Sequence, residues 1–375
     1  MKQLFRPVYE VDACLARIKT VLETGWTGTG PQCAQFENDF ADYIGNDKTN
    51  CVFLSSCTAA LQIAVRLCCL NKGDTIVSTP ITFVSTNNVI LHEGMNLKFC
   101  DVDPDTLTLD PDKLMAMLDK DYSIKAVMWV HYSGNVHPRF MEVVNWCKEK
   151  NIQIIEDCAH AMGAYYPGTK QKVGSLTSTI ACFSFQAVKN LPTFDSGMIV
   201  CREGEAERTR QLSWLGIDKS TYARTGSTDL YKWKYECVEN GFKCNGNDIA
   251  AAIAIEQLKV LDRDNTYRKM IYNNYFSTLN GKVKVFKHED KSSNHFVEIA
   301  VNNREEIMSK LKDVGYATGV HYMPNYEFSV YAKYYNGECP TCEVVSKQIM
   351  TLPTHLQITI EDIEIICNVI LQNIK

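Results

Sequence analysis

The sequence predicts an α/β protein in two parts: a large domain on a mostly parallel seven-stranded sheet flanked by helices, and a smaller C-terminal α+β domain. Between about residues 50 and 200, short apolar runs alternate with longer amphipathic segments. Repeated strand–helix alternation favours parallel pairing through right-handed crossovers. After about residue 245 the alternation stops, and a long helical pattern is followed by short strands. We therefore predict domains at residues 1–250 and 251–375.

Each element follows from its own pattern. Amphipathic segments at 58–70 and 139–151 predict helices of the first part, and 247–279 predicts one or two long helices that open the second. The second part continues with strands at 282–286 and 295–301, a helix at 304–315 and a strand at 319–322. Short apolar runs predict the seven strands of the large sheet, at 51–54, 75–79, 97–103, 125–131, 152–157, 181–185 and 198–201.

Composition excludes several classes of protein. The 375 residues are 45% hydrophobic and 22% charged, which is typical of a globular protein. A net charge of −5 gives no reason to expect nucleic-acid binding. The longest apolar stretch, 51–70, contains Arg66 and several other polar residues, so no membrane span is expected. The first residues lack the apolar core of a signal peptide, which favours a cytoplasmic protein.

Sixteen cysteines could indicate a disulfide framework, but several lie in apolar helical runs, where free cysteine acts as a small hydrophobe. A reducing compartment fits best. The single CxxC, Cys339 and Cys342, has no second pair at the spacing of a zinc site. We expect a loop entering a helix there, and no metal.

Polar residues at the carboxyl ends of the predicted strands mark the expected ligand site. Residues 55–61 join a strand to a helix, and free N–H groups there could hold an anion, although simple N-capping explains the same pattern. Asp157 ends another strand, with His160 three residues later, and an acidic residue there is usually a cap or turn former. Ser184 and Lys189 leave a third strand end, where a desolvated lysine could be a nucleophile and a solvated surface lysine is the ordinary alternative.

Together these groups match the needs of pyridoxal phosphate. A lysine forms the Schiff base, a carboxylate keeps the pyridine nitrogen protonated, and a helix N-terminus holds the phosphate. An aromatic side chain against the ring is also expected, and Phe83 follows another strand end. Plain core packing of Phe83 remains an equal alternative.

With these motifs the sequence resembles the DegT/DnrJ/EryC1/StrS family of sugar aminotransferases, which have the aspartate-aminotransferase (fold type I) architecture. The resemblance covers nearly the whole chain. It includes Gly-Trp-Thr-Gly-Thr-Gly-Pro at 25–31, Phe-Cys-Asp-Val-Asp-Pro-Asp at 99–105, the segments 55–61, 154–161 and 181–190, Gly-Val-His-Tyr at 319–322 and Thr-Leu-Pro-Thr-His-Leu at 351–356.

The resemblance implies a role for each candidate residue. Lys189 holds the cofactor and moves the proton between substrate and cofactor, while Asp157 pairs with the pyridinium nitrogen. His160 lies near the phenolic oxygen and Phe83 stacks on the ring. The active site lies at the interface of a homodimer, and the phosphate is bound by Cys57, Thr58, Ser184 and, from the partner subunit, Lys243. The substrate-contacting residues are Trp26, Thr27, His321 and Tyr322.

The implied reaction transfers an amino group from L-glutamate to a keto sugar carried by a nucleotide. The segment 130–135, Val-His-Tyr-Ser-Gly-Asn, looks more like the C4 group of the family than the C3 group. The expected acceptor is therefore an NDP-4-keto-6-deoxyhexose, and the product an NDP-4-amino-4,6-dideoxyhexose. Three alternatives stay open: 3-keto sugar amination, a sugar dehydratase (in those relatives histidine replaces the lysine that is present here), and a relative that binds without turnover.

Overall fold

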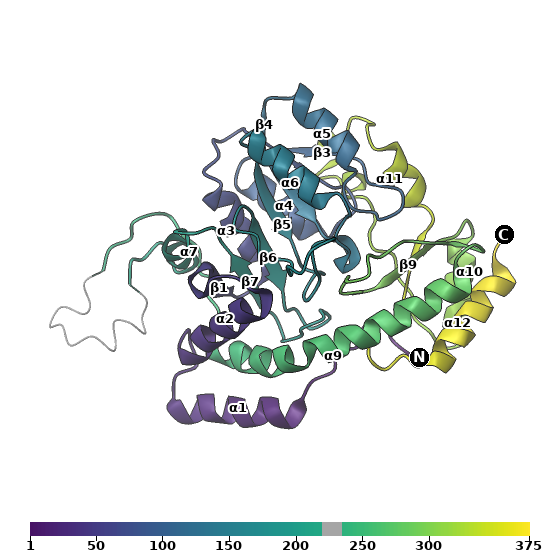
Figure 1. Ribbon diagram of the computed structural model, residues 1–375, viewed down its shortest axis with the longest axis horizontal. Helices are drawn as coiled ribbons and strands as arrows, with labels where there is room; N and C mark the ends of the chain where they lie inside the picture. The colour runs from purple at the N-terminus through teal and green to yellow at the C-terminus, as the bar shows by residue number, and fades with distance from the viewer. Residues whose placement is uncertain (220–234) are drawn as a thin grey trace.

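A seven-stranded sheet forms the centre of the computed structural model, which describes residues 1–219 and 235–375 (Figure 1). Its strand order is β1-β7-β6-β5-β4-β2-β3. Only β7 runs antiparallel to its neighbours β1 and β6, so the prediction of a mostly parallel sheet is confirmed. All seven predicted runs form strands: β1 (Cys51–Leu54), β2 (Thr75–Ser78), β3 (Asn96–Phe99), β4 (Ile124–Val130), β5 (Gln153–Asp157), β6 (Ile180–Ser184) and β7 (Gly197–Val200).

Each face of the sheet has its own hydrophobic core. Successive side chains of a strand point to opposite faces; Val52 and Leu54 of β1 belong to one core, and Phe53 to the other. The first core also takes side chains from α3 (Cys57–Leu67), α4 (Val84–His92) and α7 (Ala206–Ser213). The second takes them from α2 (Pro31–Ile44), α5 (Pro111–Lys120), α6 (Phe140–Glu149) and the start of α9 (Asp248–Leu279). Helix α1 (Val11–Thr24) lies on α9 (Figure 1).

Helix α9 joins the large sheet to the C-terminal part. Asn247 caps it by accepting a hydrogen bond from the Ala250 N–H. It is a single helix of 32 residues, the simpler of the two predicted forms. The proposed domain boundary at 250/251 falls in its first turn. The helix packs on the large-domain core through Ala254 and on a separate core through Ile271 and Tyr275.

The C-terminal part is built on a second sheet, ordered β10-β9-β8. The predicted strand at 319–322 is wrong: Gly319 makes only an isolated bridge to Thr351, and the next residues line a cavity instead of continuing a ladder. The third strand is β10, which lies later in the chain. The elements are β8 (Lys284–Val285), β9 (Val297–Ala300), α10 (Arg304–Asp313), α11 (Pro340–Val345), β10 (Ile349–Leu352) and α12 (Ile360–Asn373), with short 3₁₀ turns at Lys48–Asn50, Tyr132–Gly134, Asn325–Glu327 and Ala332–Tyr334.

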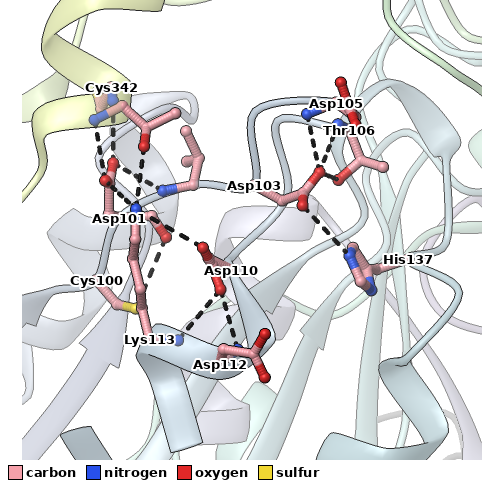
Figure 2. A network of polar contacts seen from close by, with 12 residues as sticks. Cys100, Asp101, Asp103, Asp105, Thr106, Asp110, Asp112, Lys113, His137 and Cys342 are labelled. Carbon is pink, nitrogen blue, oxygen red and sulfur yellow. Dashed lines mark hydrogen bonds and ion pairs between the residues drawn. The ribbon is translucent and has the colours of Figure 1, made fainter. Parts of the chain in front are cut away.

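A polar network ties α11 to the end of β3 (Figure 2). Buried Asp101 accepts hydrogen bonds from Lys113 Nζ at 2.7 Å and from the N–H of Cys342 at 2.9 Å. Cys339 and Cys342 are both buried where a loop enters α11, as the sequence predicted. Over the described residues, no helix has the length and apolar character needed to cross a membrane.

Candidate active site

A cavity of about 530 Å³ opens at the carboxyl ends of β4, β5 and β6, the edge at which open α/β sheets bind their ligands. Its walls come from the sheet edge, the N-terminus of α3, the segment before α4 and the loop at 321–322. Nine of the predicted site residues line it: Cys57, Thr58, Phe83, Asp157, His160, Ser184, Lys189, His321 and Tyr322.

One end of the cavity is suited to an anion. Ser56 caps α3 by accepting the Ala59 N–H, and the next two residues, Cys57 and Thr58, face the cavity. The first N–H groups of a helix have no partner inside it, and the helix dipole favours negative charge there. Gly197 of β7 lies so close that an added Cβ would come within 2.5 Å of the Cys57 nitrogen. The strand can therefore support the helix N-terminus only with glycine at this position.

Asp157, the last residue of β5, places a carboxylate in the cavity wall. Its Oδ2 accepts a hydrogen bond from the Thr86 hydroxyl at 2.7 Å and its Oδ1 accepts the Ala159 N–H at 3.0 Å. Burial raises the pKa of Asp157, although these donors and nearby Lys189 oppose the shift. A carboxylate short of compensating charge favours a cationic partner such as a protonated ring nitrogen.

Lys189 follows β6 and has no hydrogen-bond or ion-pair partner for its Nζ in the described part of the chain. The side chain is half-buried in the cavity wall, and this burial lowers the pKa of Lys189 to about 8, although Asp157 acts in the opposite direction. A lysine with a lowered pKa has a larger neutral fraction near pH 7, and only the neutral amine is a nucleophile.

His160 and Phe83 lie on other walls. The His160 Nε2 is 3.3 Å from the Tyr322 hydroxyl, whereas its Nδ1 is buried without a hydrogen-bond partner. Burial, followed by the charge of Lys189, keeps the pKa of His160 well below its usual value, so the ring is neutral. Phe83 is 59% exposed, which excludes plain core packing and leaves its ring free to cover a ligand.

Three predicted residues lie elsewhere. Trp26, Thr27 and Lys243 line a second cavity of about 470 Å³, beside Trp214 and Asn245. The Lys243 Nζ donates to Asn245 Oδ1 at 2.8 Å and lies 3.7 Å from the centre of the Trp214 ring. Within one chain, these residues are therefore not part of the cavity that contains Lys189.

The cavity is also lined by residues that the sequence did not single out, among them Thr86, Asp195, Phe5 and His295. Thr86 lies three residues after Phe83, near the end of a predicted strand, and could have been found there as a donor. Asp195 lies between β6 and β7, outside the motifs that the sequence offered. Phe5 and His295 carry no local signal, because they reach the cavity from segments far from every motif.

Pyridoxal phosphate fits the residues present. The group needs an anion site, a carboxylate for its ring nitrogen, an amine for its aldehyde and a partner for its phenolic oxygen. The α3 N-terminus, Asp157 and Lys189 provide the first three. The imidazole of His160, which lines the same cavity, is the candidate for the fourth.

Comparison with known proteins identifies the family of the chain. Over 365 residues the chain is 32% identical to the spore coat polysaccharide biosynthesis protein SpsC of Bacillus subtilis (93% of this chain, 91% of SpsC). The sugar aminotransferase CalS13 of Micromonospora echinospora superposes with a TM-score of 0.89 at 26% identity, over 100% of both chains. Spr1654 of Streptococcus pneumoniae, solved in its PLP form, superposes with a TM-score of 0.85 at 27% identity (98% and 97% covered). The DegT/DnrJ/EryC1/StrS aminotransferase family matches residues 9–371, so the expected resemblance is confirmed and the chain belongs to this family of transaminase enzymes.

Proposed function

We propose that the protein transfers an amino group from L-glutamate to the C4 ketone of an NDP-4-keto-6-deoxyhexose, with pyridoxal phosphate as cofactor and Lys189 as its anchor. The observation that carries this proposal is the unpartnered Lys189 amine in a cavity that also contains Asp157 and a helix N-terminus. The choice of C4 is supported by the segment 130–135, which looks more like the C4 group of the family than the C3 group. The Tyr132 hydroxyl of this segment donates to the carbonyl of His321, a residue that lines the cavity.

The residues of the cavity have separate roles in this proposed reaction. When bound, pyridoxal phosphate supplies an aldehyde and an electron-accepting ring. Asp157 holds a proton on the ring nitrogen, and the N–H groups at the start of α3 fix the phosphate. Lys189 lines the same cavity, and its amine would carry a proton to and from the substrate. The neutral ring of His160 would help to orient the cofactor from the cavity wall.

We propose further that two chains form a homodimer in which Lys243, Trp26 and Thr27 of one subunit complete the active site of the other. The support is the second cavity, which holds a lysine with no carboxylate within ion-pair distance in the described chain. Exposed apolar side chains on α1, namely Val11, Leu15 and Leu22, give the chain additional surface to bury. All sixteen cysteines are free, which supports the proposed cytoplasmic location.

Subunit complementation tests the shared site. Lys189→Ala and Lys243→Ala should each abolish or strongly reduce activity alone. A mixed dimer of the two contains one intact site, made of Lys189 from one chain and Lys243 from the other. Mixing and refolding the two variants should therefore restore activity, up to half that of wild type in each mixed dimer. No recovery from mixed dimers, demonstrated as such by mass, would contradict the shared site.

The reaction itself is tested with the purified protein, L-glutamate and a panel of UDP-, dTDP- and GDP-linked keto sugars. We expect a 4-amino-4,6-dideoxyhexose from at least one 4-keto sugar, identified by mass and NMR. Turnover of 3-keto sugars alone would replace the C4 assignment with C3. Loss of water from the sugar without amination would instead identify a dehydratase.

A further inference from the structure

His295, two residues before β9, is a wall residue of the active-site cavity that no sequence motif indicated. The side chain is only 4% exposed. Its ring lies between two others: Phe5 is stacked on it with centroids 5.6 Å apart, and His160 with centroids 4.6 Å apart. The orientation of the ring is therefore fixed on both faces, and only its two nitrogens remain to be assigned.

A chain of hydrogen bonds assigns the proton on His295. The Met162 carbonyl can only accept, so the Asn265 atom at 2.9 Å from it is the amide nitrogen, and Asn265 Oδ1 must accept from Asn190 at 2.8 Å. The Asn190 amide nitrogen also donates to the Ser293 carbonyl at 2.8 Å. Asn190 Oδ1 is then the atom that meets His295 Nδ1 at 2.8 Å, and it can only accept. The proton of a neutral His295 therefore sits on Nδ1.

The other nitrogen, Nε2, carries a lone pair at the cavity wall. In the described part of the chain no donor lies within hydrogen-bond distance of Nε2, and this atom is not fully buried. Burial, with nearby His160, Lys189 and Arg268, keeps the pKa of His295 well below its usual value. The edge of the ring that faces the cavity is therefore acceptor-only near neutral pH.

His321 makes a useful contrast. Its Nδ1 lies 2.9 Å from the Thr351 hydroxyl, which can either donate or accept. The proton of His321 can therefore occupy either nitrogen, whereas that of His295 cannot.

The two substrates of an aminotransferase differ in what they offer such an edge. The side chain and α-carboxylate of an amino-acid donor are acceptors, which an acceptor-only nitrogen repels. A sugar presents hydroxyl groups, which donate. We infer that His295 is a specificity-determining residue of the second half of the reaction: its Nε2 accepts a hydrogen bond from a hydroxyl of the keto sugar. This inference rests on the proposed function.

Two substitutions separate the nitrogens of His295. In His295→Asn, the amide nitrogen can still donate to Asn190, but no acceptor reaches the Nε2 position. In His295→Gln, the amide oxygen reaches the Nε2 position, but the donor to Asn190 is lost. We expect His295→Asn to react with glutamate as wild type does, within about 2-fold, and to raise the KM for dTDP-4-keto-6-deoxyglucose, or for the panel sugar that wild type aminates fastest, by about 10-fold. His295→Gln should recover most of that loss.

The two half-reactions are followed separately in single turnovers, from the loss and return of the visible absorbance of the cofactor bound to Lys189. Equal slowing of both halves by His295→Asn, or no effect on either, would overturn the inference. So would ¹⁵N NMR of histidine-labelled wild type showing His295 protonated on Nε2. If wild type aminates no keto sugar at all, the proposed function fails too; a wild type that is active beside an unaffected His295→Asn removes this inference alone.

Discussion

Asp101 lies just after β3 and Asp157 is the last residue of β5; both are parallel strands of the central sheet, and each aspartate has a lysine nearby. Asp101 forms an ion pair with Lys113 at 2.7 Å and also accepts the backbone N–H groups of Thr341 and Cys342 (Figure 2). Burial alone would raise the pKa of Asp101, but these donors outweigh it and the pKa is lowered. Every acceptor position is used, and the network joins two parts of the fold.

The two charged groups in the cavity lack such partners. Asp157 forms no ion pair in the described chain, and the Lys189 amine has no hydrogen-bond partner. Burial raises the pKa of Asp157 and lowers that of Lys189, so each group is pushed toward its neutral form. Isolated charged groups in such surroundings cost stability, and a fold retains them where a ligand compensates. We therefore propose that the Asp101 pair stabilises the fold and that the Asp157 pair binds the cofactor and takes part in the reaction.

The largest effect that this comparison predicts is on activity, in Lys189→Ala. Loss of the amine removes both the anchor and the proton carrier, so turnover should fall by about 10³-fold or more. Because the amine has no partner, thermal unfolding of the cofactor-free protein should occur at the same temperature or higher. Measured with glutamate and the preferred keto sugar, activity above one tenth of wild type would show that Lys189 is not the reacting lysine.

Asp157→Asn should also act on the reaction. It keeps the shape and the bond from Thr86 but loses the charge that holds the ring proton, and we expect activity to fall by about 10²–10³-fold. The visible band of the bound cofactor should remain, because Lys189 is intact. The matched variant Asp101→Asn should retain activity within a few-fold; a loss as large as that of Asp157→Asn would erase the distinction between the two sites.

Asp101→Ala should act on stability instead. It leaves Lys113 and two backbone N–H groups without their acceptor, and we expect the free energy of unfolding in urea to fall by about 3 kcal/mol. Asp112→Ala is the control: this carboxylate lies in the same segment but is 76% exposed, so its loss should change stability by less than about 0.5 kcal/mol. Equal effects from the two substitutions would mean that the buried network does not hold α11 in place.

Much of the fold could be predicted from the sequence because parallel strands are buried on both faces and therefore appear as apolar runs. The same rule failed at 319–322. Gly319-Val320-His321-Tyr322 has the composition of a strand, but His321 and Tyr322 face a cavity, and only Gly319 pairs with another strand. Composition cannot distinguish a residue that packs between helices from one that lines a pocket.

The residues of the candidate site were likewise predictable only in part. Lys189, Asp157 and Ser184 could be found because each lies at or just beyond the end of a strand, where topology alone directs them to one edge of the sheet. Phe5 and His295 could not. Their place depends on how the N-terminal segment and the stretch before β9 pack against the sheet, and this meeting of distant segments leaves no local pattern in the sequence.

The smallest expected effect is the pH dependence of cofactor attachment. Only the neutral amine attacks the aldehyde, and with a pKa of about 8 Lys189 is roughly 10% neutral at pH 7 and half neutral at pH 8, against about 0.03% at pH 7 for an ordinary lysine. Protonation dominates below the pKa, so the rate of attachment to cofactor-free protein should rise about 5-fold from pH 7 to 8 and level off above pH 9. Asp157 raises the pKa of Lys189, so Asp157→Asn should move the midpoint to lower pH. The rate is followed by the growth of visible absorbance. A midpoint near pH 10 in wild type would mean that the cavity does not lower the pKa of Lys189. The electrostatic difference between the Asp157–Lys189 pair and the Asp101–Lys113 pair would then be lost.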